Sequence, residues 1–189
     1  TILSNIQLFD HPNYFRKDLY TSMNTLTYEN LHETKKHVSI QFPYNTYLCS
    51  IPLDFTQVPL HWHNDVEIIV IKKGCGIISV DTKPRVVKAG DIVLVRPGQL
   101  HSISQHGKEC MEYENILFQT SLLYSADSDL RTVGYFQPYF SLEYELPWLF
   151  DDTCFFHEEL SSCIDAIDDL CSKRPVSYTH LRAHETLMN

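Results

Sequence analysis

The sequence lacks the features that would place the chain in a membrane or on DNA by itself. No stretch approaches the roughly 18 to 20 consecutive apolar residues that a membrane helix needs, so we expect no membrane partner. Its 15 lysines and arginines face 24 aspartates and glutamates, for a net charge of −9. DNA binding depends on neutralising phosphates. The basic residues form no cluster, so this chain alone is a poor candidate for DNA binding.

Markers of secretion and of a cysteine-bound metal are also missing. No C-x-x-C pair occurs, and the cysteines are scattered through apolar or helical surroundings. No basic and apolar leader opens the chain, which begins with Thr1. We therefore expect reduced, mostly buried thiols in the cytoplasm and no disulfide framework. The six cysteines are Cys49, Cys75, Cys110, Cys154, Cys163 and Cys171.

What is present suits one globular domain with appendages. The chain has 189 residues, of which 43% are hydrophobic and 21% charged, enough to bury one core. Between 38 and 120, short β segments are punctuated by glycine and proline, a spacing typical of a mainly β, antiparallel sandwich or barrel. The strands predicted within it are 47–52, 60–72, 76–80, 84–87, 91–95 and 112–119, with a hairpin turn at 81–83.

The segments that follow the predicted barrel differ in character. Residues 121–150 are rich in aromatics and interrupted by Pro138 and Pro147, which indicates loop and short turns packed on the barrel. Over 151–172 apolar residues recur at helical spacing and form one stripe. The stripe must bury against the barrel or against a second copy of the chain. Its members are Phe156, Leu160, Cys163, Ile164, Ile167, Leu170 and Cys171.

The beginning of the chain, 1–37, is interpreted as an N-terminal arm. Residues 1–22 show no sustained period, and Met23 is the first methionine. Two alternatives stay open. Met23 is the true start and the residues before it are translated upstream DNA, or the arm is real from Thr1 onward.

One segment, His61-Trp-His-Asn-Asp-Val-Glu67, carries unusual chemistry for a strand. His61, His63 and Glu67 differ by even numbers, so on one strand they project from the same face. The opposite face is apolar, with Trp62, Val66, Ile68 and Val70. A strand whose core-facing residues are two imidazoles and a carboxylate indicates something polar inside the barrel. A third imidazole, His101, follows the turn at Pro97-Gly98.

These residues form a pair of motifs that resembles the cupin superfamily. H-x-H-x(3)-E-x(6)-G runs from His61 to Gly74, and G-x(6)-P-G-x(2)-H runs from Gly90 to His101. The second motif departs from the usual P-x-G, and the asparagine often found after the histidine is missing. The segments HWHNDVEIIVIKKGCG and VKAGDIVLVRPGQLHSI resemble the barrels of AraC-type regulators, over 47–118 well and over the helical segment loosely.

The resemblance implies a cupin-type antiparallel double-sheet barrel, or jelly roll, followed by a C-terminal helical segment. It implies an effector-sensing and dimerising domain that binds a small molecule such as a sugar, with 151–175 as a dimerisation helix. DNA would be contacted only through a C-terminal helix-turn-helix domain absent from this chain. His61, His63, Glu67 and His101 map onto the family's metal ligands. They either hold a divalent transition metal or line an effector pocket that requires none.

Two other functions compete with the regulator. A metal-dependent cupin enzyme, such as a dioxygenase or sugar-phosphate isomerase, would use the same four residues and need an open coordination position. A sugar-binding module without catalysis is the third. The helical segment after the barrel disfavours the enzyme, and the intact ligand set favours it.

Some conspicuous residues are discounted. The segment 176–186 resembles, residue for residue, one reading frame of a transposon-type sequencing adapter. We therefore interpret 176–189 as an artefactual tail after a gene cut near Pro175, and give no weight to the zinc-like spacing of His180, His184 and Glu185. Asp165, Asp168 and Asp169 are interpreted as a solvated helix face, and Trp62 as a core or helix-packing residue.

Overall fold

A computed structural model describes residues 25–38, 44–123, 136–140, 142 and 145–172. The predictions for 1–22, Met23 and the tail 176–189 fall outside these residues. Its helices are α2 (Thr25–Glu29), η1 (Thr120–Leu122), α3 (Gln137–Phe140) and α4 (His157–Ser172). Its strands are β1 (Tyr44–Ile51), β2 (Gln57–His61), β3 (Val66–Val80), β4 (Lys83–Lys88), β5 (Ile92–Val95), β6 (His101–Gln105), β7 (Met111–Phe118) and β8 (Leu149–Phe150).

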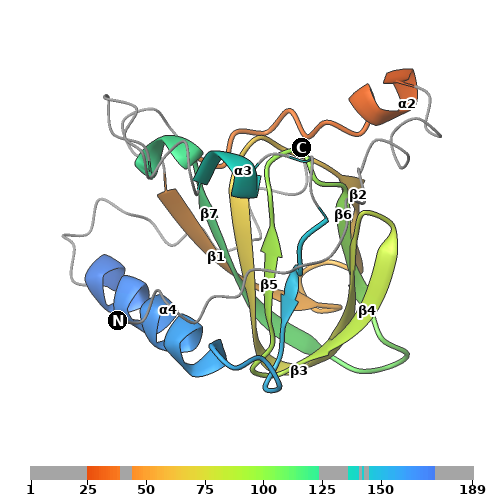
Figure 1. Ribbon diagram of the computed structural model, residues 1–189. Helices are drawn as coiled ribbons and strands as arrows, with labels where there is room; N and C mark the ends of the chain where they lie inside the picture. The colour runs from red at the N-terminus through yellow and green to blue at the C-terminus, as the bar shows by residue number, and fades with distance from the viewer. Residues whose placement is uncertain (1–24, 39–43, 124–135, 141, 143–144, 173–189) are drawn as a thin grey trace.

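Two antiparallel sheets share the long strand β3 and form the barrel of Figure 1. The first half of β3 pairs with β7 and β5, with β1 beyond β7 and β8 beyond β5. The second half pairs with β4 and β6, and β2 lies beyond β6. The mainly β, antiparallel double-sheet fold predicted from the sequence is confirmed.

A bulge lets β3 cross from one sheet to the other. The register shifts between Ile71 and Lys73, and Gly74 follows with φ +72°. A Cβ at Gly74 would lie 1.8 Å from the carbonyl oxygen of Cys110, so only glycine fits there. Ile69 and Ile71 belong to the core before the bulge, and Ile78 and Val80 after it. Because of the extra residue, odd-numbered side chains of β3 face the interior before the bulge and even-numbered ones face it afterwards.

The predicted strand 60–72 is wrong as one element. β2 ends at His61, a turn follows, and β3 begins at Val66. Conversely, 76–80 is the second half of β3, because the bulge bends that strand without ending it. The hairpin at 81–83 is present, with positive φ at Asp81 and Thr82, as a tight two-residue turn requires. β6 and β8 were not predicted.

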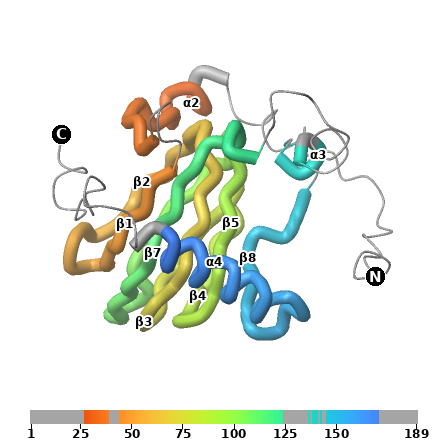
Figure 2. The backbone as a smooth tube through the Cα atoms, turned by 90° about the vertical axis from the view of Figure 1, so that its left-hand side faces the viewer, coloured from red at the N-terminus to blue at the C-terminus, as the bar shows by residue number. Residues whose placement is uncertain are grey.

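Helix α4 lies across the outer face of the sheet formed by β7, β3 and β5 (Figure 2). Ile164 is 2% exposed and packs with Ile92 and Ile116, and Leu160 joins the same cluster. The stripe therefore buries in part against the chain's own barrel. The helix begins at His157, later than predicted, because Asp151 Oδ1 accepts hydrogen bonds from Thr153 and holds a turn there.

The prediction of mostly buried cysteines is wrong for the residues that the structure describes. Cys49 is buried in the barrel, but Cys110 and Cys163 are exposed, and Cys75 and Cys154 are intermediate. Cys110 precedes β7 in a surface turn and Cys163 lies on an exposed part of α4. These five thiols are free. Among the described residues, no helix has the length and apolarity to span a membrane.

Candidate functional site

The barrel encloses a pocket of about 540 Å³, counting the space at its open mouth. Its wall combines residues of both sheets with residues of the arm segment 25–38. The lining residues are Glu33, Lys35, His37, Tyr47, Cys49, Phe55, Val58, His61, His63, Glu67, His101, Ile103, Tyr113, Asn115 and Leu117. All four polar residues singled out from the sequence lie here, although they come from β2, the following turn, β3 and β6 rather than from one strand and a loop.

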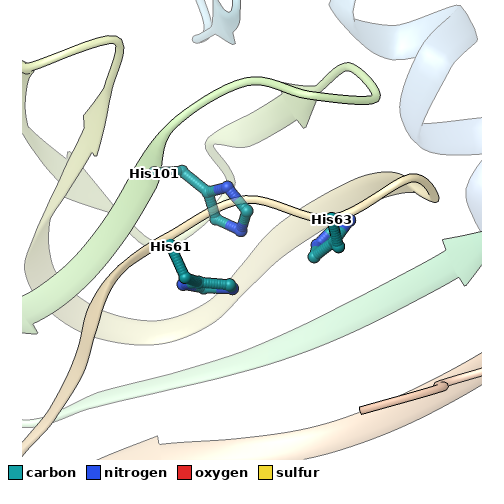
Figure 3. Close-up of side chains that lie close together, drawn as sticks. All are labelled: His61, His63 and His101. Carbon is teal, nitrogen blue, oxygen red and sulfur yellow. The ribbon is translucent and has the colours of Figure 1, made fainter. Parts of the chain in front are cut away.

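The three imidazoles lie close together (Figure 3), and a backbone carbonyl orients each of them. His61 Nδ1 lies 2.8 Å from the carbonyl oxygen of Pro59, His63 Nδ1 3.0 Å from that of Asp65, and His101 Nδ1 2.9 Å from that of Gln99. A carbonyl can only accept a hydrogen bond, so each Nδ1 must donate. Nε2 is then the remaining polar atom of each ring; that of His63 is hydrogen-bonded to Glu67, and that of His101 lies beside the same carboxylate.

Glu67 lies between two of the three rings. Its Oε2 is 3.2 Å from His63 Nε2 and 2.9 Å from His101 Nε2. Complete burial would raise the pKa of Glu67, but the contacts with His101 and His63 hold that pKa well below its ordinary value. Burial would lower the pKa of His63, but the hydrogen bond to Glu67 and the negative charges of Glu67, Glu33 and Asp65 together outweigh burial and raise that pKa. Glu67 is therefore an ionised carboxylate among imidazoles.

His61 differs electrostatically from His63. Burial and the neighbouring His101 lower the pKa of His61 to about 4, so this ring is neutral near pH 7. Cys49, on the same wall, is also an uncharged group, because burial raises the pKa of its thiol to about 12. The pocket thus combines a neutral imidazole, a carboxylate in contact with two further imidazoles, and an uncharged thiol within one apolar barrel.

Three arm residues line the pocket and were not found from the sequence, namely Glu33, Lys35 and His37. Glu33 Oε2 lies 2.9 Å from His37 Nε2 and 3.6 Å from His61 Nε2. Burial would raise the pKa of Glu33, but the hydrogen bond from His37 and the nearby histidines lower it. No periodic signal marks 25–38, so only the path of the chain could place these side chains.

The arm is attached to the barrel through Trp62. Its ring stacks on Tyr28 with centroids 4.7 Å apart and lies 4.1 Å from the ring of His32. Its Nε1 donates to the carbonyl oxygen of Tyr28 at 2.8 Å. The interpretation of Trp62 as a helix-packing residue is confirmed, since Tyr28 belongs to α2.

Replacing Trp62 with alanine should release the arm. We expect a loss of about 2 kcal/mol in the free energy of unfolding, because a half-buried ring and its stacking partner are separated. Urea unfolding measures the loss, and limited proteolysis should show faster cleavage within 25–38. Trp62→Phe keeps the stacking and should cost only about 1 kcal/mol for the hydrogen bond. Equal losses in the two variants would contradict the importance of stacking.

His101 is positioned by a buried polar network. Gln99, whose carbonyl orients the ring, donates through Nε2 to Asp81 Oδ2 at 2.8 Å and accepts from the Arg96 backbone N–H at 2.7 Å. Arg96 in turn donates to the carbonyl oxygen of Tyr139 in α3 at 3.1 Å. Gly98 N donates to the carbonyl oxygen of His63 at 2.8 Å. The turn 96–99 therefore links two pocket histidines to α3.

The donor set fits a divalent transition metal. The ligand atoms of His61, His63 and His101 all lie within 4.8 Å of one another, and Glu67 adds an oxygen beside two of them. His101 Nε2 is buried and makes no hydrogen bond, despite its proximity to Glu67. Imidazole and carboxylate ligands suit zinc, iron, nickel, copper or manganese. The carbonyls at each Nδ1 are the outer-shell partners that such ligands use.

The other residues discussed from the sequence are separate from this pocket. His180, His184 and Glu185 lie outside the described residues. Asp168 is not simply solvated, because its Oδ2 lies 3.7 Å from Lys72 Nζ, which also contacts Glu114 at 2.7 Å. That ion pair ties α4 to the sheet.

Comparison with known proteins places the chain in a family. The AraC-like ligand binding domain family matches residues 54–166, which include both motifs and most of α4. The chain belongs to this family. The resemblance to AraC-type cupin barrels is thereby confirmed, while the gene truncation and the adapter origin of 176–186 stay predictions.

Individual proteins match this AraC-like ligand binding domain at low sequence identity and over only part of the chain. The uncharacterized HTH-type transcriptional regulator YdeC of Bacillus subtilis (strain 168) is 28% identical over 123 residues, which are 65% of this chain and 41% of that protein. The chain thus spans less than half of that regulator's length. A cupin protein from Bacteroides fragilis is 23% identical with a TM-score of 0.40, covering 45% of this chain and 73% of its own. A predicted oxalate decarboxylase from Thermotoga maritima is 31% identical with a TM-score of 0.32, and the match covers 33% of this chain and 56% of that protein.

Proposed function

We propose that this chain is the effector-sensing part of a cytoplasmic AraC-type transcription regulator. An effector enters the barrel pocket and changes how the barrel and α4 dock on a partner subunit. That docking positions helix-turn-helix domains, which belong to the rest of the regulator. DNA is contacted only through them, since this chain carries a net charge of −9. An effector shifts such an equilibrium only by its differential affinity for the two arrangements.

The observation that carries the proposal is a cluster of buried, oriented polar groups in an apolar barrel. His63, Glu67 and His101 are at most 4% exposed, and burying such groups is costly unless they are paired or bind something. The arm covers one side of their pocket through Glu33 and His37. The HTH-type relative supports the regulatory context. Phe155 and Leu170, both exposed, are available for the contact between two subunits.

A thermal-shift screen tests the proposal. Monosaccharides, small organic acids and divalent metal ions are added separately to the purified chain and to His63→Ala. We expect at least one class to stabilise the unaltered chain and not the variant. A ligand at a hundred times its Kd adds about 2.7 kcal/mol to the free energy of unfolding. Failure of every compound, or equal stabilisation of both proteins, would count against a sensing pocket.

A metal-dependent enzyme is the second candidate, and the three convergent Nε2 atoms favour it. A metal held there would supply a Lewis acid or an activated water. Incubation of the metal-treated chain with sugar phosphates, followed by assay of aldose–ketose interconversion, and oxygen uptake with small organic acids address this function. If the chain shows turnover and His101→Ala abolishes it, the enzyme function is favoured over the sensing function.

A further inference from the structure

A second carboxylate, outside the two family motifs, reaches the histidine cluster from the arm. Glu33 Oε2 lies 3.6 Å from His61 Nε2, and both residues line the pocket. The side chains of Glu33 and His61 are 20% and 18% exposed, so the pair is largely withdrawn from solvent. Glu67 contacts the other two histidines, and Glu33 contacts the third.

The backbone holds Glu33 in this position. Glu33 N donates to the carbonyl oxygen of Trp62 at 2.9 Å, and Trp62 N donates to the carbonyl oxygen of Leu31 at 3.0 Å. Trp62 is the residue between His61 and His63 in sequence. The arm is therefore hydrogen-bonded to the same short segment that carries two of the three imidazoles.

The carboxylate of Glu33 is also oriented by its own partners. His37 Nε2 donates to Glu33 Oε2 at 2.9 Å, and His37 Nδ1 lies 3.4 Å from the hydroxyl of Tyr47. Asn45 Nδ2 donates to that hydroxyl at 2.8 Å and to the carbonyl oxygen of His37 at 2.9 Å. Such supporting hydrogen bonds are what fixes a metal-ligating carboxylate.

The separation of Glu33 and His61 leaves room for a cation between them. Because His61 Nδ1 lies against the carbonyl oxygen of Pro59, Nε2 is the ring atom that faces Glu33. The 3.6 Å between His61 Nε2 and Glu33 Oε2 is too long for a direct hydrogen bond, whereas an ion between the two atoms would contact both. Neighbouring nitrogen and oxygen ligands of a five-coordinate zinc ion, each about 2.1 Å from it, are about 3.0 to 3.6 Å apart. The observed separation falls within that range.

We propose that Glu33 is an additional ligand of a divalent transition metal bound by His61, His63, His101 and Glu67, and that the ion fastens the arm to the barrel. The inference rests on the proposed function and makes it more specific, because it names a metal ion as the effector. Binding favours the arrangement in which Glu33 lies at the pocket, since only that arrangement supplies all five ligands.

The test uses the whole chain after removal of metal with EDTA. Zn²⁺ is titrated by calorimetry into the unaltered chain and Glu33→Gln, and Co²⁺ is added in parallel because its visible absorption reports its ligands. We expect Glu33→Gln to weaken Zn²⁺ binding by about tenfold or more and to alter the Co²⁺ spectrum. Hydrogen exchange should show that Zn²⁺ protects the amides of 31–37 in the unaltered chain and not in the variant.

Glu29→Gln is the matched control, because Glu29 lies on the same arm and is exposed. It should leave Zn²⁺ affinity, the Co²⁺ spectrum and the exchange pattern unchanged. An unaltered affinity and spectrum in Glu33→Gln would overturn the proposal. So would a lack of Zn²⁺-induced protection in the unaltered chain, a result that does not depend on whether the variant folds.

Failure here and failure of the sensing function give different results. If Zn²⁺ binds, His101→Ala abolishes binding and Glu33→Gln does not weaken it, the barrel is a metal-capable pocket without an arm ligand. If Zn²⁺ does not bind while a monosaccharide or organic acid stabilises the chain through His63, the sensor stands and the metal proposal is wrong. If neither Zn²⁺ nor any other compound binds, both the metal proposal and the sensing function are wrong.

Discussion

Substitution of Ile164 by aspartate is expected to lower the free energy of unfolding by about 4 kcal/mol, and the melting temperature by about 10 °C. Ile164 is 2% exposed and packs against Ile92 and Ile116 on the outer face of the sheet. A carboxylate there loses the apolar contact and is itself left without a partner. Urea unfolding and a thermal scan measure the effect.

The control for this substitution is Ala166→Asp, on an exposed part of the same helix. It should change stability by less than about 0.5 kcal/mol. Sedimentation of both variants addresses the predicted homodimer independently. If Ile164→Asp stays as stable as the unaltered chain and sediments as a monomer, Ile164 belongs to a contact between subunits, and its packing on the chain's own barrel is not what stabilises it.

Removal of the His101 ring is expected to reduce Zn²⁺ affinity at least a hundredfold. Its Nε2 is buried, makes no hydrogen bond and lies among the ligand atoms of the pocket. In His101→Ala only two imidazoles remain as ligands, and Glu67 loses its contact with His101 Nε2. Calorimetry on the metal-free chain measures the loss, and circular dichroism verifies the fold.

His106→Ala serves as the control for this second substitution. His106 follows β6 in an exposed turn and contacts Cys75 at 3.7 Å, away from the pocket lining. Its replacement should leave Zn²⁺ affinity unchanged. Equal binding by His101→Ala and the unaltered chain would mean that any Zn²⁺ binds elsewhere, and the four motif residues would then be lining residues of an effector pocket.

The site was predictable to the extent that local patterns encode it. The spacing of His61, His63 and Glu67 indicated side chains on one face, and they do converge with His101. The prediction assumed that the three residues share one strand, but a turn at 62–65 separates β2 from β3. The motif placed its residues correctly although the predicted strand was wrong, since strand parity describes direction only within one uninterrupted element.

Strand β6 and the arm show where local patterns fail. His-Ser-Ile-Ser-Gln at 101–105 carries little apolar signal, and it becomes a strand through pairing with β2 and β3. Leu149–Phe150 is a strand only because β5 offers it a free edge. Such elements are created by their neighbours, so propensity alone does not reveal them.

An antiparallel sandwich or barrel could be predicted from the order of residues alone, because hydrophobic alternation and turn residues are local properties. The two motifs added the resemblance to the family and the four polar residues. Three features became known only from the folded chain: which ring nitrogen of each histidine lies against a backbone carbonyl, the contact of Glu33 with His61, and the packing of Ile164 on the chain's own sheet. These facts depend on contacts between residues far apart in the chain. Such contacts follow from how the bulge, turns and arm route the backbone, and no period in the sequence records that route.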